Sequence, residues 1–387
     1  MKQDFHGYYK PSEAEFSKIW DEATIVVDAN ILLNLYTYST ATSDEVLKLL
    51  NEFDERLWIP HQVAHEYHEN RCGIILKEVR RYSDIDKALD TIGAALRAKK
   101  QHPYISEELS EKFEDLKAEI KSELQKGKSA HQRLITDDEI CEKISDCFNG
   151  KVGSPLGEKE ILEIHKDGAI RYGKKIPPGY KDIKKPEPDR YGDLLIWHQM
   201  MKHSKTSKRS VIFVTDDLKE DWWAFAEDKR IGPRPELRHE FRLIAENDIY
   251  IYSSDAFIEI ANKQGKKLSD VATEEIEKAS EVRQIDAIEE REIDELLKTY
   301  DDPVNKLIKH QEALERLTRD PFEKFRKQQE AFERLTRDPF EKIRKQQELF
   351  ERINRDPFEK FRKQMEALER FKQRVDVKPD DALPEED

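Results

Sequence analysis

Short apolar runs alternate with amphipathic segments in the first two thirds of the chain. The apolar runs are rich in β-branched and aromatic residues, which favour strands. These runs are TIVVD (24–28), RLWIP (56–60), SVIFVT (210–215) and DIYIY (248–252). The segments between them, such as SDEVLKLLNEF (43–53) and PELRHEFRLIAEN (235–247), carry apolar residues at helical spacing. Strands that alternate with helices predict an α/β domain with a mainly parallel sheet.

The hydrophobic pattern changes along the chain and so predicts its division into parts. Composition changes with it, from Gly- and Trp-containing sequence to highly charged, Gly-poor sequence. The predicted parts are an α/β domain at 1–263 with a helical insertion at about 70–175, an acidic helical connector at 264–301, four helical repeats at 302–373 and an acidic disordered tail at 374–387.

The repeats have a period of 18 residues. Three full copies begin at Asp320, Asp338 and Asp356, and a degenerate copy begins at Asp302. Each full copy opens with Asp-Pro and has a Glu three residues after the Asp, which is typical of a helix start. Apolar residues then recur on one helical face, so we expect an all-α repeat region. The prolines favour short stacked or hairpin helices over one kinked helix, and both remain open.

Charge is unevenly distributed. Charged residues make up 39% of the chain and hydrophobic residues 37%, which is too polar for one compact core throughout. The net charge of −14 lies entirely in residues 270–302, with 13 acids and 4 bases, and residues 376–387, with 6 acids and 1 base. The remainder is neutral in sum, so a local basic surface for phosphates is compatible with the sequence.

Several classes of protein are disfavoured. The sequence has no apolar run of about 18 residues and no apolar signal core, so we expect a cytoplasmic protein without a membrane partner. Cys72, Cys141 and Cys147 form no CxxC pair and are odd in number, which argues against a disulfide framework or a structural zinc site. The phosphate-loop, dinucleotide and GxSxG patterns are absent.

Five acidic residues stand where chemistry is expected. Asp28 ends TIVVD, and Asp216 and Asp217 follow VIFVT, at the carboxyl ends of predicted strands, where open α/β sheets bind ligands. Glu66 and Asp193 lie in predicted helices. Each acid taken alone also fits a helix cap, a turn or a solvated charge.

Histidines and tryptophans offer weaker candidates. His61, His65 and His68 share one helical face and could in principle bind a transition metal, but HEYH misses the HExxH spacing. Trp197, Trp222 and Trp223 could stack on bases, although we favour burial for them.

The acidic residues lie in segments that together resemble the PIN-domain nucleases, specifically the larger bacterial PIN-like group with a long middle insertion. The segments are VVDANILLNLY, WIPHQVAHEYHENR, RYGKKIPPGYKD with YGDLLIWHQM, and VIFVTDDLKEDWW. They occur in the order the family shows, over about two thirds of the chain. The resemblance implies a doubly wound α/β domain whose acids bind Mg²⁺ or Mn²⁺ and hydrolyse phosphodiesters, most often in RNA.

The resemblance also suggests individual roles. The last acid of the family usually stands two residues after a Ser or Thr, which corresponds to Asp217, with Asp216 as the alternative. Converging carboxylates repel one another and need protons or cations, and oxygen ligands suit Mg²⁺ or Mn²⁺. A two-ion arrangement would activate a water and stabilise the leaving oxygen. The expected roles are a bridging ligand for Asp28, flanking ligands for Asp193 and Asp217, a ligand or water-orienting base for Glu66, and orienting groups for Asn30 and Thr215.

The leading hypothesis is therefore a metal-dependent endonuclease, with RNA favoured over DNA by the resemblance alone. A role as a toxin or anti-phage effector would suit it, and residues 302–373 would drive self-assembly or bind a protein partner. The rival hypothesis is a non-catalytic scaffold or sensor with a degenerate PIN-like domain that acts through its repeats. The complete acid set favours the enzyme, because a site that has lost its activity has no physical reason to keep mutually repelling carboxylates.

Overall fold

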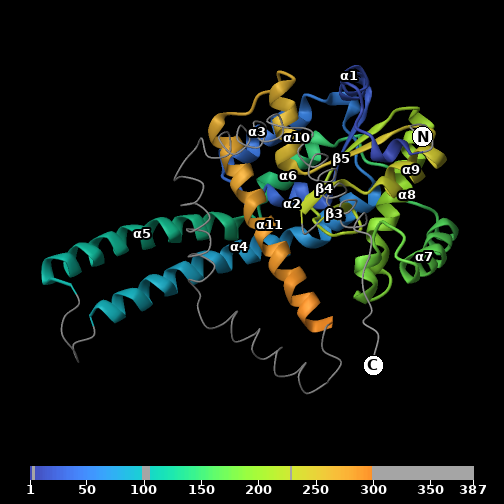
Figure 1. Ribbon diagram of the computed structural model, residues 1–387. Coiled ribbons are helices and arrows are strands. Elements are labelled where there is room, and N and C mark those ends of the chain that lie inside the picture. The colour runs from blue at the N-terminus through green and yellow to red at the C-terminus, as the bar shows by residue number, and fades with distance from the viewer. Residues whose placement is uncertain (2–4, 98–104, 227–228, 299–387) are drawn as a thin grey trace, which may run out of the picture. The chain divides into compact units, whose positions relative to one another are not determined.

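The computed structural model describes residues 1, 5–97, 105–226 and 229–298 (Figure 1). The chain separates into two compact units, residues 1–292 and 293–387, and the elements below belong to the first unit, apart from the end of its last helix. The four predicted repeats and the acidic tail lie outside the described residues and stay a prediction.

A three-stranded parallel sheet forms the centre of the first unit. Its strands are β1 (Thr24–Val27), β2 (Val211–Val214) and β5 (Ile249–Tyr252), in the order β1-β2-β5. Every residue of β1 and β2 is buried, as in parallel sheets covered on both faces. Val27 pairs with Val214, and Val214 with Tyr252, so the three strands end at the same edge.

The predicted strand RLWIP is not a regular strand. Leu57 and Ile59 form only isolated parallel bridges, to Ile25 and Val152. The segment is short because it lies between two helices. The 3₁₀ helix η2 (Asp54–Arg56) precedes it, and Pro60, which has no N–H to donate, is the N-cap of the next helix. The chain therefore has room for single bridges beside β1 and no longer ladder.

Helices surround the sheet, and several of them fall within the range expected for the insertion. Within the insertion, α4 and α5 pack side by side as two long helices (Figure 1). The described helices are α1 (Glu13–Glu22), α2 (Ala29–Asn34), α3 (Thr40–Asn51), α4 (His61–Leu96), α5 (Glu107–Arg133), α6 (Glu139–Cys147), α7 (Glu158–Gly173), α8 (Gly192–Ser207), α9 (Pro235–Ala245), α10 (Ser254–Lys263) and α11 (Asp270–Lys298). The short 3₁₀ helices are η1 (His6–Tyr8), η2, η3 (Tyr180–Lys184) and η4 (Asp189–Tyr191).

A small antiparallel hairpin was not predicted. Its strands are β3 (Trp223–Ala226) and β4 (Lys229–Pro233). Most of their residues are partly or fully exposed, so the sequence carries no regular alternation of apolar and polar positions that would reveal them.

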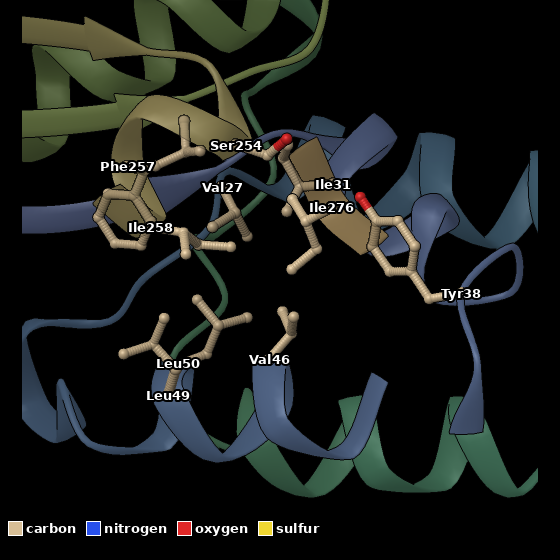
Figure 2. A pocket seen from close by; sticks show the side chains of 11 residues that line it. Val27, Ile31, Tyr38, Val46, Leu49, Leu50, Ser254, Phe257, Ile258 and Ile276 are labelled. Atoms are coloured by element: carbon tan, nitrogen blue, oxygen red, sulfur yellow. The ribbon is translucent and has the colours of Figure 1, made fainter. Parts of the chain in front are cut away.

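The core packs around the sheet and contains the tryptophans whose burial was expected. Trp197, Trp222 and Trp223 are 0%, 1% and 4% exposed, which confirms that prediction. A small apolar cavity of about 20 Å³ remains between the sheet and α2, α3, α10 and α11, with Val46 and Ile276 among its lining residues (Figure 2). It is about the size of one water, and apart from Tyr38 and Ser254 its lining residues are aliphatic or aromatic hydrocarbons, so it is a packing gap.

Two further expectations concern thiols and membranes. Cys72, Cys141 and Cys147 are free cysteines. In the part of the chain that the structure describes, no helix combines the length and the apolar character needed to cross a bilayer.

Candidate active site

Asp28 follows β1 directly and caps the next helix. Its Oδ1 accepts a hydrogen bond of 2.7 Å from the backbone N–H of Ala29, at the start of α2. Its Oδ2 accepts from Asn30 Nδ2 at 2.7 Å and from Thr215 Oγ1 at 2.6 Å. The side chain is thus held by the end of β1, the start of α2 and the end of β2. Asp28 can therefore cap α2 and also take part in a functional site.

The electrostatic environment of Asp28 is unfavourable for its charge. Burial raises the pKa of Asp28 to about 7, and the hydrogen bond from Thr215 opposes that rise. The negative charges of Glu66 and Asp217 raise the pKa further. These three carboxyl groups, from β1, α4 and the loop after β2, are therefore close enough to affect one another.

Thr215 and Asn30 connect the two strand ends. Besides donating to Asp28, Thr215 Oγ1 accepts hydrogen bonds from Asn30 Nδ2 at 3.1 Å and from the N–H of Asp217 at 3.0 Å. Asn30 Oδ1 accepts from the N–H of Asp216 at 3.0 Å. The loop after β2 is thereby fixed to the start of α2.

Asp216 and Asp217 have different surroundings. Both carboxylate oxygens of Asp216 are engaged, by four contacts that come from α2, α10 and α11. These are hydrogen bonds from Asn34 Nδ2 (2.8 Å), Ser254 N (2.9 Å) and Ser254 Oγ (2.9 Å), and an ion pair with Arg283 (2.9 Å). Asp217 instead faces Lys219, whose N–H donates to Oδ1 at 2.9 Å and whose Nζ lies 2.8 Å from Oδ2.

Asp193 and Glu66 bring two helices to the cluster. Asp193 is the second residue of α8, and burial raises its pKa well above the usual range, with Lys219 opposing and Asp217 adding to the rise. Burial also raises the pKa of Glu66, whose Oε1 accepts from Gln62 at 3.0 Å. A Cβ on Gly192 would lie 2.5 Å from Oε1 of Glu66, so this glycine permits the close approach of α4 and α8.

Sequence reasoning missed three charged residues of this cluster. Lys219 Nζ lies 2.8 Å from Asp217, 3.0 Å from Asp182 and 3.9 Å from Asp193. Asp221 is fully buried and accepts one hydrogen bond of 3.0 Å from the N–H of Lys181. Burial raises the pKa of Asp221 to about 6. A lysine inside the acidic stretch DDLKED was a usable signal, whereas nothing in PGYKD marked Asp182.

The donor set fits a hard divalent cation in its chemistry. Asp28, Glu66, Asp193 and Asp217 offer only carboxylate oxygens, and burial raises the pKa of three of them, so a bound cation would favour their ionised forms. As the side chains now stand, the described residues contain no group of three or more His, Cys, Asp or Glu arranged to hold a metal ion. Three acids of the cluster, Asp182, Asp193 and Asp217, instead form ion pairs with Lys219.

The histidine alternative receives no support. His65 is about half exposed and pairs with Glu69 at 3.3 Å. Burial lowers the pKa of His68, and the described residues hold no histidine cluster suited to a metal.

Comparison with known proteins identifies a family for this chain. No curated protein and no solved structure shows significant similarity to the chain. The profile of the family described as "PIN like domain" matches residues 24–237, more than half of the 387 residues. This span contains the parallel pair β1 and β2 and all the acids of the cluster. The chain therefore belongs to the PIN-like domain family, whose members are generally nucleases.

Proposed function

We propose that this protein is a metal-dependent endonuclease that uses Mg²⁺ or Mn²⁺ and prefers RNA to DNA. The observation that carries the proposal is the convergence of Asp28, Glu66, Asp193 and Asp217 from four separate segments. The charges of Glu66 and Asp217 raise the pKa of Asp28, and the charge of Asp217 raises the pKa of Asp193. Buried groups with perturbed pKa values are typical of functional sites. The preference for RNA, and a role in toxicity or anti-phage defence, come from the family resemblance.

In this proposal the residues of the cluster have separate roles in binding the metal ion, orienting its ligands and accepting a proton. A bound divalent ion would supply charge neutralisation and a more acidic water. Asp28, Asp193 and Asp217 would hold the ion, while Thr215 and Asn30 keep the Asp28 carboxylate oriented through bonds of 2.6 and 2.7 Å. Glu66, with one oxygen fixed by Gln62 and a raised pKa, suits a proton acceptor at neutral pH.

Asp216 has a structural role in this proposal. Its oxygens are committed to Asn34, Ser254 and Arg283, so few lone pairs remain for a metal ion. These contacts support Asp217, rather than Asp216, as the metal ligand in this proposal.

A direct assay tests the proposal. Full-length protein is incubated with end-labelled single-stranded RNA and DNA of the same sequence, with Mn²⁺, with Mg²⁺ or with chelator. We expect metal-dependent internal cleavage, faster on RNA. Asp28→Asn and the exposed surface variant Asp44→Asn serve as inactive and active controls. Cleavage that persists in chelator would contradict the metal requirement.

The rival proposal is a non-catalytic scaffold or sensor that acts through residues 302–373. The observation that favours it is the engagement of Asp182, Asp193 and Asp217 by Lys219, because a degenerate site could be neutralised in this way. Absence of cleavage of either nucleic acid, together with absence of Mn²⁺ binding, would support it. Self-assembly or partner binding through the repeats is part of both proposals.

A further inference from the structure

Lys219 differs from the other lysines that form ion pairs on the surface. Lys202, for example, pairs with one exposed carboxylate, Glu160, at 2.9 Å, and its own side chain is 61% exposed. Such pairs contribute little to stability. The ammonium of Lys219 faces three carboxylates from three elements: η3, α8 and the loop after β2.

The three acids around Lys219 are sheltered from solvent. The side chains of Asp182, Asp193 and Asp217 are 9%, 17% and 15% exposed. Sheltered carboxylates are costly without a counter-charge, since they have lost much of their hydration. A single ammonium at 2.8 to 3.9 Å from all three supplies part of that charge.

The main chain keeps Lys219 at this position. Its N–H donates to Asp217 Oδ1 at 2.9 Å, and its carbonyl oxygen accepts from the N–H groups of Trp222 and Trp223, each at 3.2 Å. Both tryptophans are buried. The turn is therefore anchored in the core, and the ammonium stays within reach of the cluster.

The direct ion pairs of Lys219 do not extend to Asp28 and Glu66. Among the described residues, no lysine, arginine or histidine lies within 4.0 Å of a carboxylate oxygen of Asp28 or Glu66 to form an ion pair. Lys185 and Lys219 act on Glu66 from farther away, where their positive charges lower its pKa. The direct ion pairs of Lys219 go instead to Asp182, Asp193 and Asp217.

We propose that the ammonium of Lys219 is a built-in counter-cation that takes the place of one of two cations in the acidic cluster, so that the site binds one divalent ion. The inference rests on the proposed function. It replaces the two-ion arrangement expected from the sequence with one metal ion and one fixed ammonium. An ammonium neutralises charge but does not generate a metal-bound water, so the two cations are not equivalent.

The number of Mn²⁺ ions bound per chain tests the inference. It is measured on full-length protein by isothermal titration calorimetry and by electron paramagnetic resonance of free Mn²⁺. We expect one ion in the wild type, two in Lys219→Met, which keeps length but removes charge, and one in Lys219→Arg. Lys202→Met is the matched control, with one ion. In chelator, Lys219→Met should melt at a lower temperature than the control, and Mn²⁺ should remove that difference in melting temperature.

The outcomes separate this inference from the proposed function. Two ions in the wild type would overturn the inference even if Lys219→Met failed to fold, and so would one ion in both the wild type and Lys219→Met. One ion in the wild type and two in Lys219→Met, without cleavage of RNA or DNA by the wild type, would support the inference and overturn the nuclease. Mn²⁺ binding by Lys219→Met but not by the wild type would overturn both, because the inference requires one ion in the wild type. No binding by either would overturn both.

Discussion

Thr215 Oγ1 donates a hydrogen bond of 2.6 Å to Asp28 Oδ2, which joins the carboxyl ends of β2 and β1. The two residues are 187 positions apart in the sequence and are brought together by the parallel register of the strands. The bond opposes the effect of burial on the pKa of Asp28, so it favours the ionised form that a metal ligand needs.

Removing this hydroxyl should therefore weaken the site. Thr215→Val is expected to lower the free energy of unfolding by about 1.5 to 3 kcal/mol, because the hydrogen bond is to a buried carboxylate. Mn²⁺ affinity should fall by roughly tenfold or more, as for other groups that orient metal ligands. Thr215→Ser, which keeps the hydroxyl, should retain most of both. Urea unfolding and calorimetry check this, and equal effects of Val and Ser would contradict the orienting role.

Loss of a proposed ligand should abolish activity without unfolding the protein. Asp28→Asn and Asp193→Asn each remove a carboxylate at nearly constant volume, so we expect no detectable cleavage of RNA with Mn²⁺. In chelator both variants should melt slightly higher than the wild type, because one repulsive charge has left the cluster. Wild-type turnover in either variant would end the metal-site hypothesis.

The raised pKa of Asp28 predicts how the metal-free protein responds to pH. Its pKa is about 7 in the folded state against 3.8 ordinarily, so the folded state holds the proton more tightly. Stability should therefore be highest below about pH 4 as far as this group is concerned, and should fall as pH rises from 4 to 7, by on the order of 4 kcal/mol. Urea unfolding in chelator at several pH values measures the fall.

Asp28→Asn is the control for that experiment. It cannot ionise, so its stability should fall less over the same pH range, and the difference from the wild type isolates Asp28 from other buried acids such as Asp221. Parallel pH profiles for the two proteins would show that Asp28 is not the responsible group.

Substitution of the two neighbouring aspartates should separate stability from activity. Asp217→Asn is expected to lose cleavage and Mn²⁺ affinity with little change in stability. Asp216→Ala leaves Arg283, Asn34 and Ser254 without their partner, so it should lower the free energy of unfolding by about 2 to 4 kcal/mol. A larger loss of Mn²⁺ affinity in the folded Asp216 variant would reverse the assignment.

The sequence was informative where a local pattern determines position. Asp28 follows a fully buried run of β-branched residues, and that run becomes β1, so its place at the sheet edge follows from strand pattern and parallel topology. The fold class and the family were predictable for the same reason. The prediction of a strand at RLWIP was wrong because the segment has the composition of a strand, while η2 and Pro60 limit its length.

Other features depend on contacts between distant segments and leave no local signal. The different roles proposed for Asp216 and Asp217 depend on where Ser254 and Arg283 lie, and both belong to elements far along the chain. Lys219 meets Asp182 only because η3 lies beside the loop after β2. Charge composition cannot reveal such pairs when 39% of all residues are charged.

The last prediction concerns the repeats at 302–373, where the argument comes from sequence alone. Each unit of 18 residues presents apolar side chains that an isolated helix of about 15 residues cannot bury, since helices of that length are marginal in water. We therefore expect full-length protein to be oligomeric or bound to a partner, and a truncation ending near Tyr300 to be a monomer that keeps metal-dependent cleavage. Light scattering on both proteins, with cleavage assays as the control for folding, measures this. A monomeric full-length protein with no partner recovered from cells would refute the assembly role, and an oligomeric truncation would move the interface into the nuclease domain.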